Sequence, residues 1–100
     1  MTTIPIRSYV IVRAKEAGVF AGTLEFRHKD EVLLSTVRRI WEWHGAASLS
    51  QLAQEGTSEP ENCKLPCPVD HILLPGGVIE ILAVTRAAQK CLESIPIWTA

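Results

Sequence analysis

The alternation of apolar and polar positions in the first half of the chain predicts three strands. Residues 9–14 are rich in β-branched side chains, and a second apolar run covers residues 19–26, where Gly22 predicts a bulge or a close backbone approach. A charged reverse turn at residues 27–31 separates this run from residues 32–44, which contain no glycine or proline. Because that last segment holds many residues that favour strands, we expect one long, bent third strand.

A short helix is predicted directly after this strand. Ser48 occupies an N-cap position, and Gln51, three residues later, completes a capping box. Gly56 follows where a helix C-terminus favours glycine. One apolar face, with the spacing of helical neighbours, is formed by Leu49, Leu52 and Ala53. We therefore expect about two turns of helix.

The second half begins with an irregular segment and then returns to strand patterns. Residues 57–68 contain three prolines and predict no regular structure. Residues 69–74 and 78–84 are apolar runs on either side of Pro-Gly-Gly at positions 75–77. This tripeptide is a turn signal and predicts a hairpin between the two strands.

A second short helix and an apolar tail complete the predicted elements. Thr85 can cap a helix over residues 86–94, and residues 95–100 read Ile-Pro-Ile-Trp-Thr-Ala. The predicted order is β-β-β-α-β-β-α with short connections. We expect an α+β fold, a single small domain over residues 1–100 with a curved antiparallel sheet of about five strands and two short helices.

Composition narrows the setting in which such a domain works. Hydrophobic residues make up 47% of the chain and charged residues 21%, which is typical of a globular domain. The formal charge of -1 disfavours nucleic acid as a partner, because that affinity depends on many Lys and Arg contacts to phosphate. The N-terminal residues lack the pattern of a signal peptide, the apolar runs are too short for a membrane span, and three cysteines are an odd number. These features predict a cytoplasmic location without a membrane partner.

The strongest candidate site is the block Arg-Arg-Ile-Trp-Glu-Trp-His-Gly-Ala-Ala-Ser at positions 38–48. If the strand is extended, alternation places on one face Leu33, Ser35, Val37, Arg39, Trp41 and Trp43. An Arg beside indole rings can clamp a planar anion, and the free N–H groups of the following helix favour a phosphate. The predicted ligand-binding residues are Arg38, Arg39, Trp41, Trp43, His44, Ala47 and Ser48.

A structural and a catalytic alternative compete with this interpretation. Paired Trp side chains on a strand are commonly core, in which case Arg39 needs a carboxylate partner such as Glu80. His44 and Ser48 resemble a base and a nucleophile only in their closeness, since Ser48 is explained as a cap. We therefore predict no enzyme activity and no catalytic residue.

No metal or cofactor is predicted either. Cys63, Cys67 and His71 form C-x3-C-x3-H, but structural zinc sites use closer cysteine pairs and need a fourth ligand. Pro66 and Pro68 also prevent one helix from aligning the three side chains. Two thiols in a partly packed loop are the favoured interpretation.

The apolar tail predicts an interface. Ile95, Ile97 and Trp98 would form a sticky surface if they were exposed at the end of a small protein. We therefore expect partial burial and a homo-oligomer contact through these residues.

The block at positions 38–53, with the pattern Arg-Arg-x-Trp-x-Trp-x-Gly-Ala-Ala-Ser-Leu-Ser-Gln-Leu-Ala, resembles a family of small bacteriophage and prophage proteins known only as a domain of unknown function. The similarity covers nearly the whole chain; Pro-Gly-Gly at 75–77 departs from it. The resemblance implies a phage accessory protein in the host cytoplasm and supplies no catalytic residues.

Together these patterns predict a non-enzymatic accessory binding protein, acting in counter-defence or host takeover. It would sequester a small anionic, nucleotide-like ligand or occlude a host protein. The alternative is a homo-oligomeric structural or interaction module in which the Trp block is core. A minor alternative is nucleic-acid binding through a local patch made of Arg7, Arg13, Lys15, Arg38 and Arg39.

Overall fold

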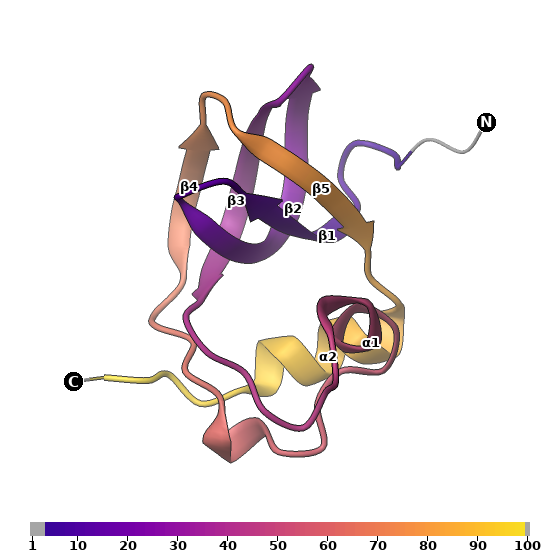
Figure 1. The fold of residues 1–100 in the computed structure, drawn as a ribbon, viewed down its shortest axis with the longest axis vertical. Coiled ribbons are helices and arrows are strands. Elements are labelled where there is room, and N and C mark those ends of the chain that lie inside the picture. Colours follow the sequence, from indigo (N-terminus) through magenta and orange to yellow (C-terminus); the bar gives the residue numbers. More distant parts are fainter. Residues whose placement is uncertain (1–3, 100) are drawn as a thin grey trace.

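Five antiparallel strands form one sheet that curls around its own core, with two helices packed on its outer face (Figure 1). The computed structural model describes residues 4–99; the ends of the predicted domain and Ala100 of the tail lie outside them. The elements are β1 (Tyr9–Ala14), β2 (Gly18–His28), β3 (Glu31–Ile40), α1 (Leu49–Glu55), a 3₁₀ turn η1 (Pro60–Asn62), β4 (Val69–Leu74), β5 (Val78–Ala83) and α2 (Arg86–Ser94). The predicted α+β class and element order are confirmed.

The predicted hairpin between β4 and β5 is wrong. The strand order is β4-β3-β2-β1-β5, so these two strands form opposite edges of the sheet, although only three residues join them. The edges of a flat five-stranded sheet would lie about 19 Å apart. A link of this length spans at most about 14 Å. The sheet therefore has to curl until its edges approach at one corner, which Figure 1 shows.

The link between β4 and β5 is hydrogen-bonded to the β1–β2 turn and to the β2–β3 turn. The Gly77 N–H donates to Asp30 Oδ2 at 2.9 Å, and the Gly77 carbonyl accepts from the Lys15 N–H at 2.7 Å. Asp30 belongs to the β2–β3 turn and Lys15 to the β1–β2 turn. Gly77 has a φ of 79°, which glycine adopts without strain. The Pro-Gly-Gly signal thus marks a crossing between sheet edges.

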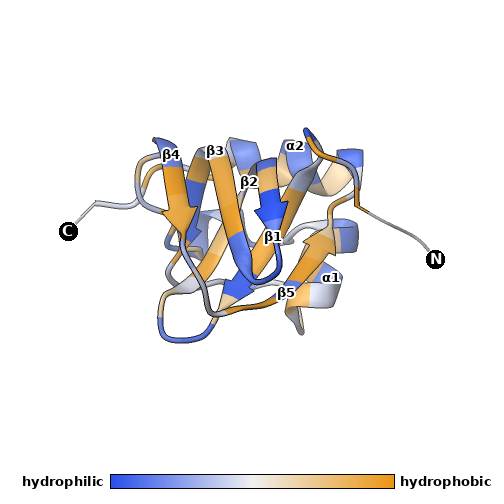
Figure 2. Cartoon of the chain, turned by 90° about the horizontal axis from the view of Figure 1, so that it is seen from above, coloured by the Kyte–Doolittle hydropathy of each residue, from blue (hydrophilic) through white to orange (hydrophobic). Residues whose placement is uncertain are grey.

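Curling gives the sheet two buried faces, and β1 is buried on both. The inner cluster, enclosed by the curl, consists of Val10, Val12, Ala14, Phe20, Leu24, Val32, Leu34, Val37 and Leu74. The outer cluster, beneath the helices, consists of Tyr9, Ile11, Ala21, Ile40, Leu52, Ala53, Cys63, Leu65, Leu92 and Ile95. In Figure 2 the strands are largely orange, whereas α1 and α2 carry blue stretches, as expected for helices buried on one side only. Among residues 4–99, no helix has the length and apolar character needed to cross a bilayer.

The third strand is shorter than predicted and contains a bulge. It ends at Ile40, which pairs with Val19 near the start of β2, so beyond this point the neighbouring strand supplies no further partner. The chain turns instead to Lys64, whose carbonyl accepts from the Trp41 N–H at 3.0 Å. The expectation of a continuous strand to His44 is therefore wrong.

The bulge interrupts the predicted alternation of β3, so the residues before it are offset from those after it. The register with β2 shifts between Ala21 and Thr23, and Thr36 has a φ of 45°. As a result Leu34 and Val37, three residues apart, both face the inner cluster. Leu33 and Ser35 consequently do not share a face with Arg39, contrary to the alternation expected from the sequence.

Gly22 is the residue that permits this bulge. A Cβ at this position would lie 2.9 Å from the Val37 Cβ, closer than such atoms approach. The close backbone approach and the bulge predicted at Gly22 are both confirmed.

Both predicted helices are present with their caps. The Ser48 hydroxyl accepts from the Gln51 N–H at 3.2 Å, and the Thr85 hydroxyl accepts from the Ala88 N–H at 3.1 Å. The Gln51 side-chain oxygen accepts from the Ala47 N–H, one residue earlier than in a standard capping box. Thr85 also donates to the Gln54 carbonyl at 2.7 Å, which joins the start of α2 to α1.

Candidate functional site

A hollow of about 310 Å³ lies where β2 begins and β3 ends. Its walls are residues 16–19 from the β1–β2 turn and the start of β2, residues 39–41, and Trp43. We call it the aromatic hollow. Its volume is at the lower end of the roughly 300–1,000 Å³ that small-molecule sites occupy.

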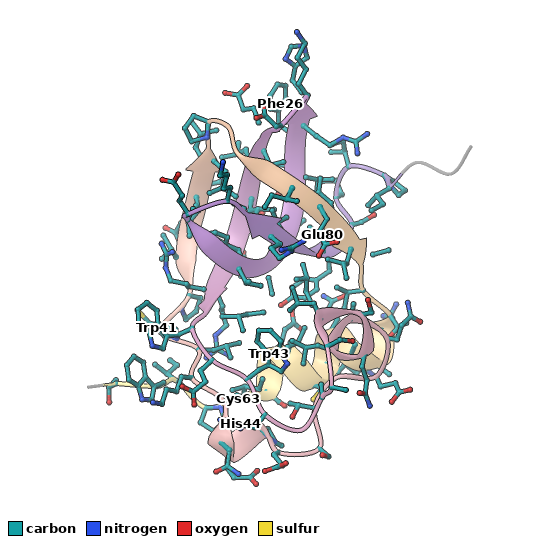
Figure 3. The ribbon with its side chains drawn as sticks, viewed as in Figure 1. Phe26, Trp41, Trp43, His44, Cys63 and Glu80 are labelled. Atoms are coloured by element: carbon teal, nitrogen blue, oxygen red, sulfur yellow. The ribbon has the colours of Figure 1, made fainter. Side chains whose placement is uncertain are left out.

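Two indoles contribute to the aromatic hollow in different ways. The Trp41 side chain is 66% exposed, whereas Trp43 is partly buried and packs against the outer cluster. Figure 3 shows Trp41 pointing away from the fold and Trp43 directed between the sheet and the helices. One ring is therefore free for a ligand, and the other is a rigid wall held by the core.

Arg39 gives the aromatic hollow its positive charge. Its guanidinium lies over the Phe20 ring, 4.6 Å from the centroid, and Nη1 donates to the Ala17 carbonyl at 2.9 Å. The expected partner, Glu80, instead accepts from Arg13 Nε on the neighbouring strand at 2.9 Å. The predicted Arg39–Glu80 pair is therefore wrong. Stacking and one hydrogen bond orient the guanidinium and leave other N–H groups of Arg39 for a ligand.

Arg38 lies on the opposite face, and its donors are consumed by the protein. It is 6% exposed, and burial lowers the pKa of its guanidinium. The acceptors are the carbonyl oxygens of Leu65, Pro66, Leu92, Ile95 and Pro96, at 2.7 to 3.4 Å. A guanidinium has five N–H groups, so these five carbonyls use its whole capacity. Arg38 thus holds the end of α2, the tail and residues 65–66 together, and has no donor for an anion.

The remaining predicted ligand residues lie outside the aromatic hollow. His44 Nε2 contacts Glu42 Oε2 at 2.8 Å, and this contact, together with Lys64, lowers the pKa of the Glu42 carboxyl. The Ala47 N–H is bonded to Gln51, and the Ser48 hydroxyl caps α1. The structure therefore brings together Arg39, Trp41 and Trp43, and separates them from Arg38, His44, Ala47 and Ser48.

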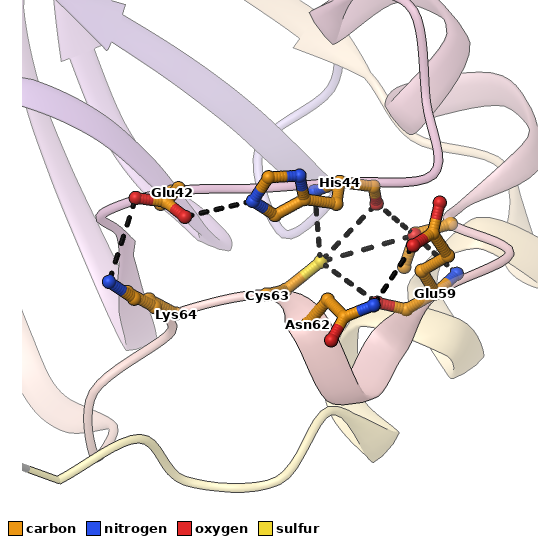
Figure 4. Close-up of polar contacts among 7 residues, drawn as sticks. Glu42, His44, Glu59, Asn62, Cys63 and Lys64 are labelled. Carbon is orange, nitrogen blue, oxygen red and sulfur yellow. Dashed lines mark hydrogen bonds and ion pairs between the residues drawn. The ribbon is translucent and has the colours of Figure 1, made fainter.

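Cys63 is buried among loop residues beside His44 (Figure 4). Its sulfur lies 3.4 Å from the His44 backbone nitrogen, 3.5 Å from the His44 carbonyl and 3.5 Å from the Glu59 carbonyl. The His44 ring points toward Glu42, so this imidazole is not positioned to activate the thiol. Cys67 and His71 are exposed, and within residues 4–99 no three Cys, His, Asp or Glu side chains form a group that could hold a metal ion.

The tail lies alongside the loop segments. Leu65 forms a parallel bridge with Ile97, and the Trp98 N–H donates to the Leu65 carbonyl at 3.0 Å. The Lys64 ammonium lies 5.5 Å from the centroid of the Trp98 ring. Of the three predicted interface residues, Ile95 is buried at 3% exposure, while Ile97 and Trp98 are 55% and 37% exposed. The interface itself stays a prediction.

The β1–β2 turn is the part of the aromatic hollow that sequence reasoning did not select. In the sequence, the tetrapeptide Lys-Glu-Ala-Gly at positions 15–18 carries the signal of a turn and nothing more. Its role at the hollow comes from the pairing of Val19 with Ile40, which places the turn beside the end of β3. No local signal in the sequence reports that long-range contact.

Comparison with known proteins gives one match. A family model described as "Domain of unknown function (DUF6948)" covers residues 7–92. No protein of the curated set and no solved structure matches the chain. The resemblance to a domain of unknown function is thus confirmed, and the phage origin stays a prediction.

Proposed function

The chain belongs to the DUF6948 family, a domain of unknown function, and from that premise we propose that it is a non-enzymatic binding protein whose aromatic hollow takes a planar, anionic ligand of the nucleotide type. The observation that carries the proposal is that Arg39, Trp41 and Trp43 line the same hollow. An exposed indole can stack on a base, and a guanidinium can pair with a phosphate. Each chemical requirement of such a ligand therefore has a side chain at the hollow.

The guanidinium of Arg39 is already held in one position, which suits a binding site better than a mobile surface charge would. Its stacking on Phe20 and its bond to Ala17 fix the guanidinium at the end of β3. Trp43 is fixed by the outer cluster. Groups that are already ordered lose less conformational entropy when a ligand arrives.

Binding without chemistry is the second half of the proposal. The imidazole of His44 is engaged with Glu42, and the Cys63 thiol is surrounded by backbone groups. The proposed setting is a phage accessory protein in the host cytoplasm, active in counter-defence or host takeover by sequestering its ligand.

Titration with cyclic and linear nucleotides, followed by tryptophan fluorescence, tests the proposal. We expect saturable quenching that weakens about tenfold or more in Arg39→Met and Trp41→Ala. Trp98→Ala is the matched control, because Trp98 is also an exposed indole but lies outside the hollow. Absence of binding at high micromolar concentrations, or equal affinity in Arg39→Met and the unaltered protein, would overturn it.

A second candidate function is protein binding or self-association through Trp41, Ile97 and Trp98. The segments that carry these residues lie on either side of residues 64–65. The Trp41 N–H donates to the Lys64 carbonyl, and the Trp98 N–H donates to the Leu65 carbonyl. All three side chains are exposed, which is unusual for large apolar residues so near one another. Light scattering of the unaltered chain and of the double variant Ile97→Ser/Trp98→Ser tests self-association. An oligomer that is lost in the variant supports self-association, and a monomer in both proteins rejects it. Removal of residues 95–100 is unsuitable, because the Ile95 carbonyl accepts from buried Arg38.

A further inference from the structure

The β1–β2 turn at the rim of the aromatic hollow is strained at Glu16. The Ala17 N–H donates to the Lys15 carbonyl at 2.8 Å, and Glu16 between them has a φ of 69°. This is a γ-turn with a positive φ at its centre, the rare and strained form. Glycine would adopt that conformation freely, whereas a side chain with a Cβ disfavours it.

The strained residue is an acidic one that lies at the edge of the ligand site. Glu16 is exposed and lines the aromatic hollow. The ion pairs found among residues 4–99 do not include Glu16 or Arg39. The hollow therefore presents an acceptor and a cation that are both available to a bound molecule.

The two groups are also coupled through the backbone. The carbonyl of Ala17, next to Glu16, accepts the hydrogen bond that orients Arg39. The turn that strains Glu16 thus also positions the guanidinium. Strain of this kind persists where the surrounding structure maintains it, and it concentrates at binding sites.

We propose that Glu16 is the specificity-determining residue of the aromatic hollow and selects a guanine base. This inference rests on the proposed function. A carboxylate accepts two parallel hydrogen bonds, and guanine offers two adjacent N–H donors on its pairing edge. Adenine and cytosine place an acceptor nitrogen beside their amino group, which a carboxylate repels. The carboxylate also repels phosphate, so the anionic end of the ligand is directed to Arg39.

The test compares GMP, IMP and AMP by tryptophan fluorescence on the full chain, on Glu16→Gln and on Glu16→Gly. IMP differs from GMP only by the missing amino group. We expect GMP to bind about tenfold or more tightly than IMP and AMP, as a bidentate contact to a base allows. Both variants should lose this preference for GMP and bind AMP at least as tightly as the unaltered protein does, because the charge that repels the adenine acceptor nitrogen and the phosphate is removed.

The outcomes separate the two proposals. If none of the three nucleotides binds, the proposed function fails and this inference fails with it. If all three bind the unaltered protein equally, or if Glu16→Gln keeps the preference for GMP, only the inference is overturned. Urea denaturation checks folding: Glu16→Gly should unfold at the same or a higher urea concentration, because glycine relieves the strained φ.

Discussion

Arg38 and Arg39 are neighbours in sequence, yet they belong to regions with opposite properties. Alternation along β3 directs one side chain under the helices and the other toward the aromatic hollow. Under the helices, five carbonyl oxygens surround the Arg38 guanidinium. At the hollow, Arg39 is exposed and, among residues 4–99, bonds to a single carbonyl, that of Ala17.

The comparison shows that the role of an arginine follows from how many of its donors the fold consumes. A guanidinium saturated by carbonyls works as a structural fastener, since it satisfies acceptors at the C-terminus of α2 that the helix leaves open. One that is stacked and only partly bonded keeps both its charge and its remaining donors for a ligand. The helix-covered region should therefore govern stability, and the aromatic hollow should govern binding.

Replacing each arginine by methionine is the strongest way to break this comparison. Arg38→Met should lower the free energy of unfolding by about 3–5 kcal/mol, because it leaves several buried carbonyls without a donor. Arg39→Met should lower it by less than about 1 kcal/mol, the value of an exposed cation–π contact. Urea denaturation monitored by circular dichroism measures both. Similar losses in the two variants would contradict the assignment of separate roles.

Tyr9 makes the helix-covered region sensitive to high pH. Burial, followed by the negative charge of Glu93, raises the pKa of its hydroxyl from 10.0 to about 12. The unfolded chain therefore loses this proton at lower pH than the folded one. The contribution of neutral Tyr9 to the free energy of unfolding is fully present below pH 10. About 2–3 kcal/mol of the free energy of unfolding is lost as the pH rises to about 12.

The chain's single tyrosine makes this measurement direct. Ultraviolet absorbance of the phenolate reports its titration, and urea denaturation at increasing pH reports the loss of stability. Tyr9→Phe serves as the control, because it should not show the tyrosine-dependent part of the decline. Ionisation of Tyr9 near its ordinary pKa in the folded protein would show that the region is more open than described.

Local features of this fold could be predicted from the sequence, and long-range ones could not. The caps Ser48 and Thr85 and the bulge at Gly22 depend on contacts between near neighbours or on missing side chains, which a sequence displays. The hairpin prediction failed because Pro-Gly-Gly reports a change of direction only. Which strand edge the chain then meets is decided by the curl of the sheet, to which the buried faces of all strands contribute.

The candidate site shows the same division. Alternation placed Arg39, Trp41 and Trp43 together in a strand that in fact ends at Ile40. They still meet at one hollow because the chain after Ile40 stays extended enough to bond with Lys64. Glu16 could not be found in this way, since its place beside Arg39 depends on the register of β2 against β3.

The two indoles give the smallest but most local test of the comparison. Trp43 packs against the outer cluster, whereas Trp41 is 66% exposed. Trp43→Ala should therefore lower the free energy of unfolding by about 2 kcal/mol, less than for a fully buried ring. Trp41→Ala should change it by no more than about 0.5 kcal/mol, because the bond from the backbone N–H of Trp41 to Lys64 is kept. Equal losses in urea denaturation would place both rings in the core and remove the free stacking surface from the aromatic hollow, whereas the expected difference leaves Trp41 with no structural reason to be tryptophan.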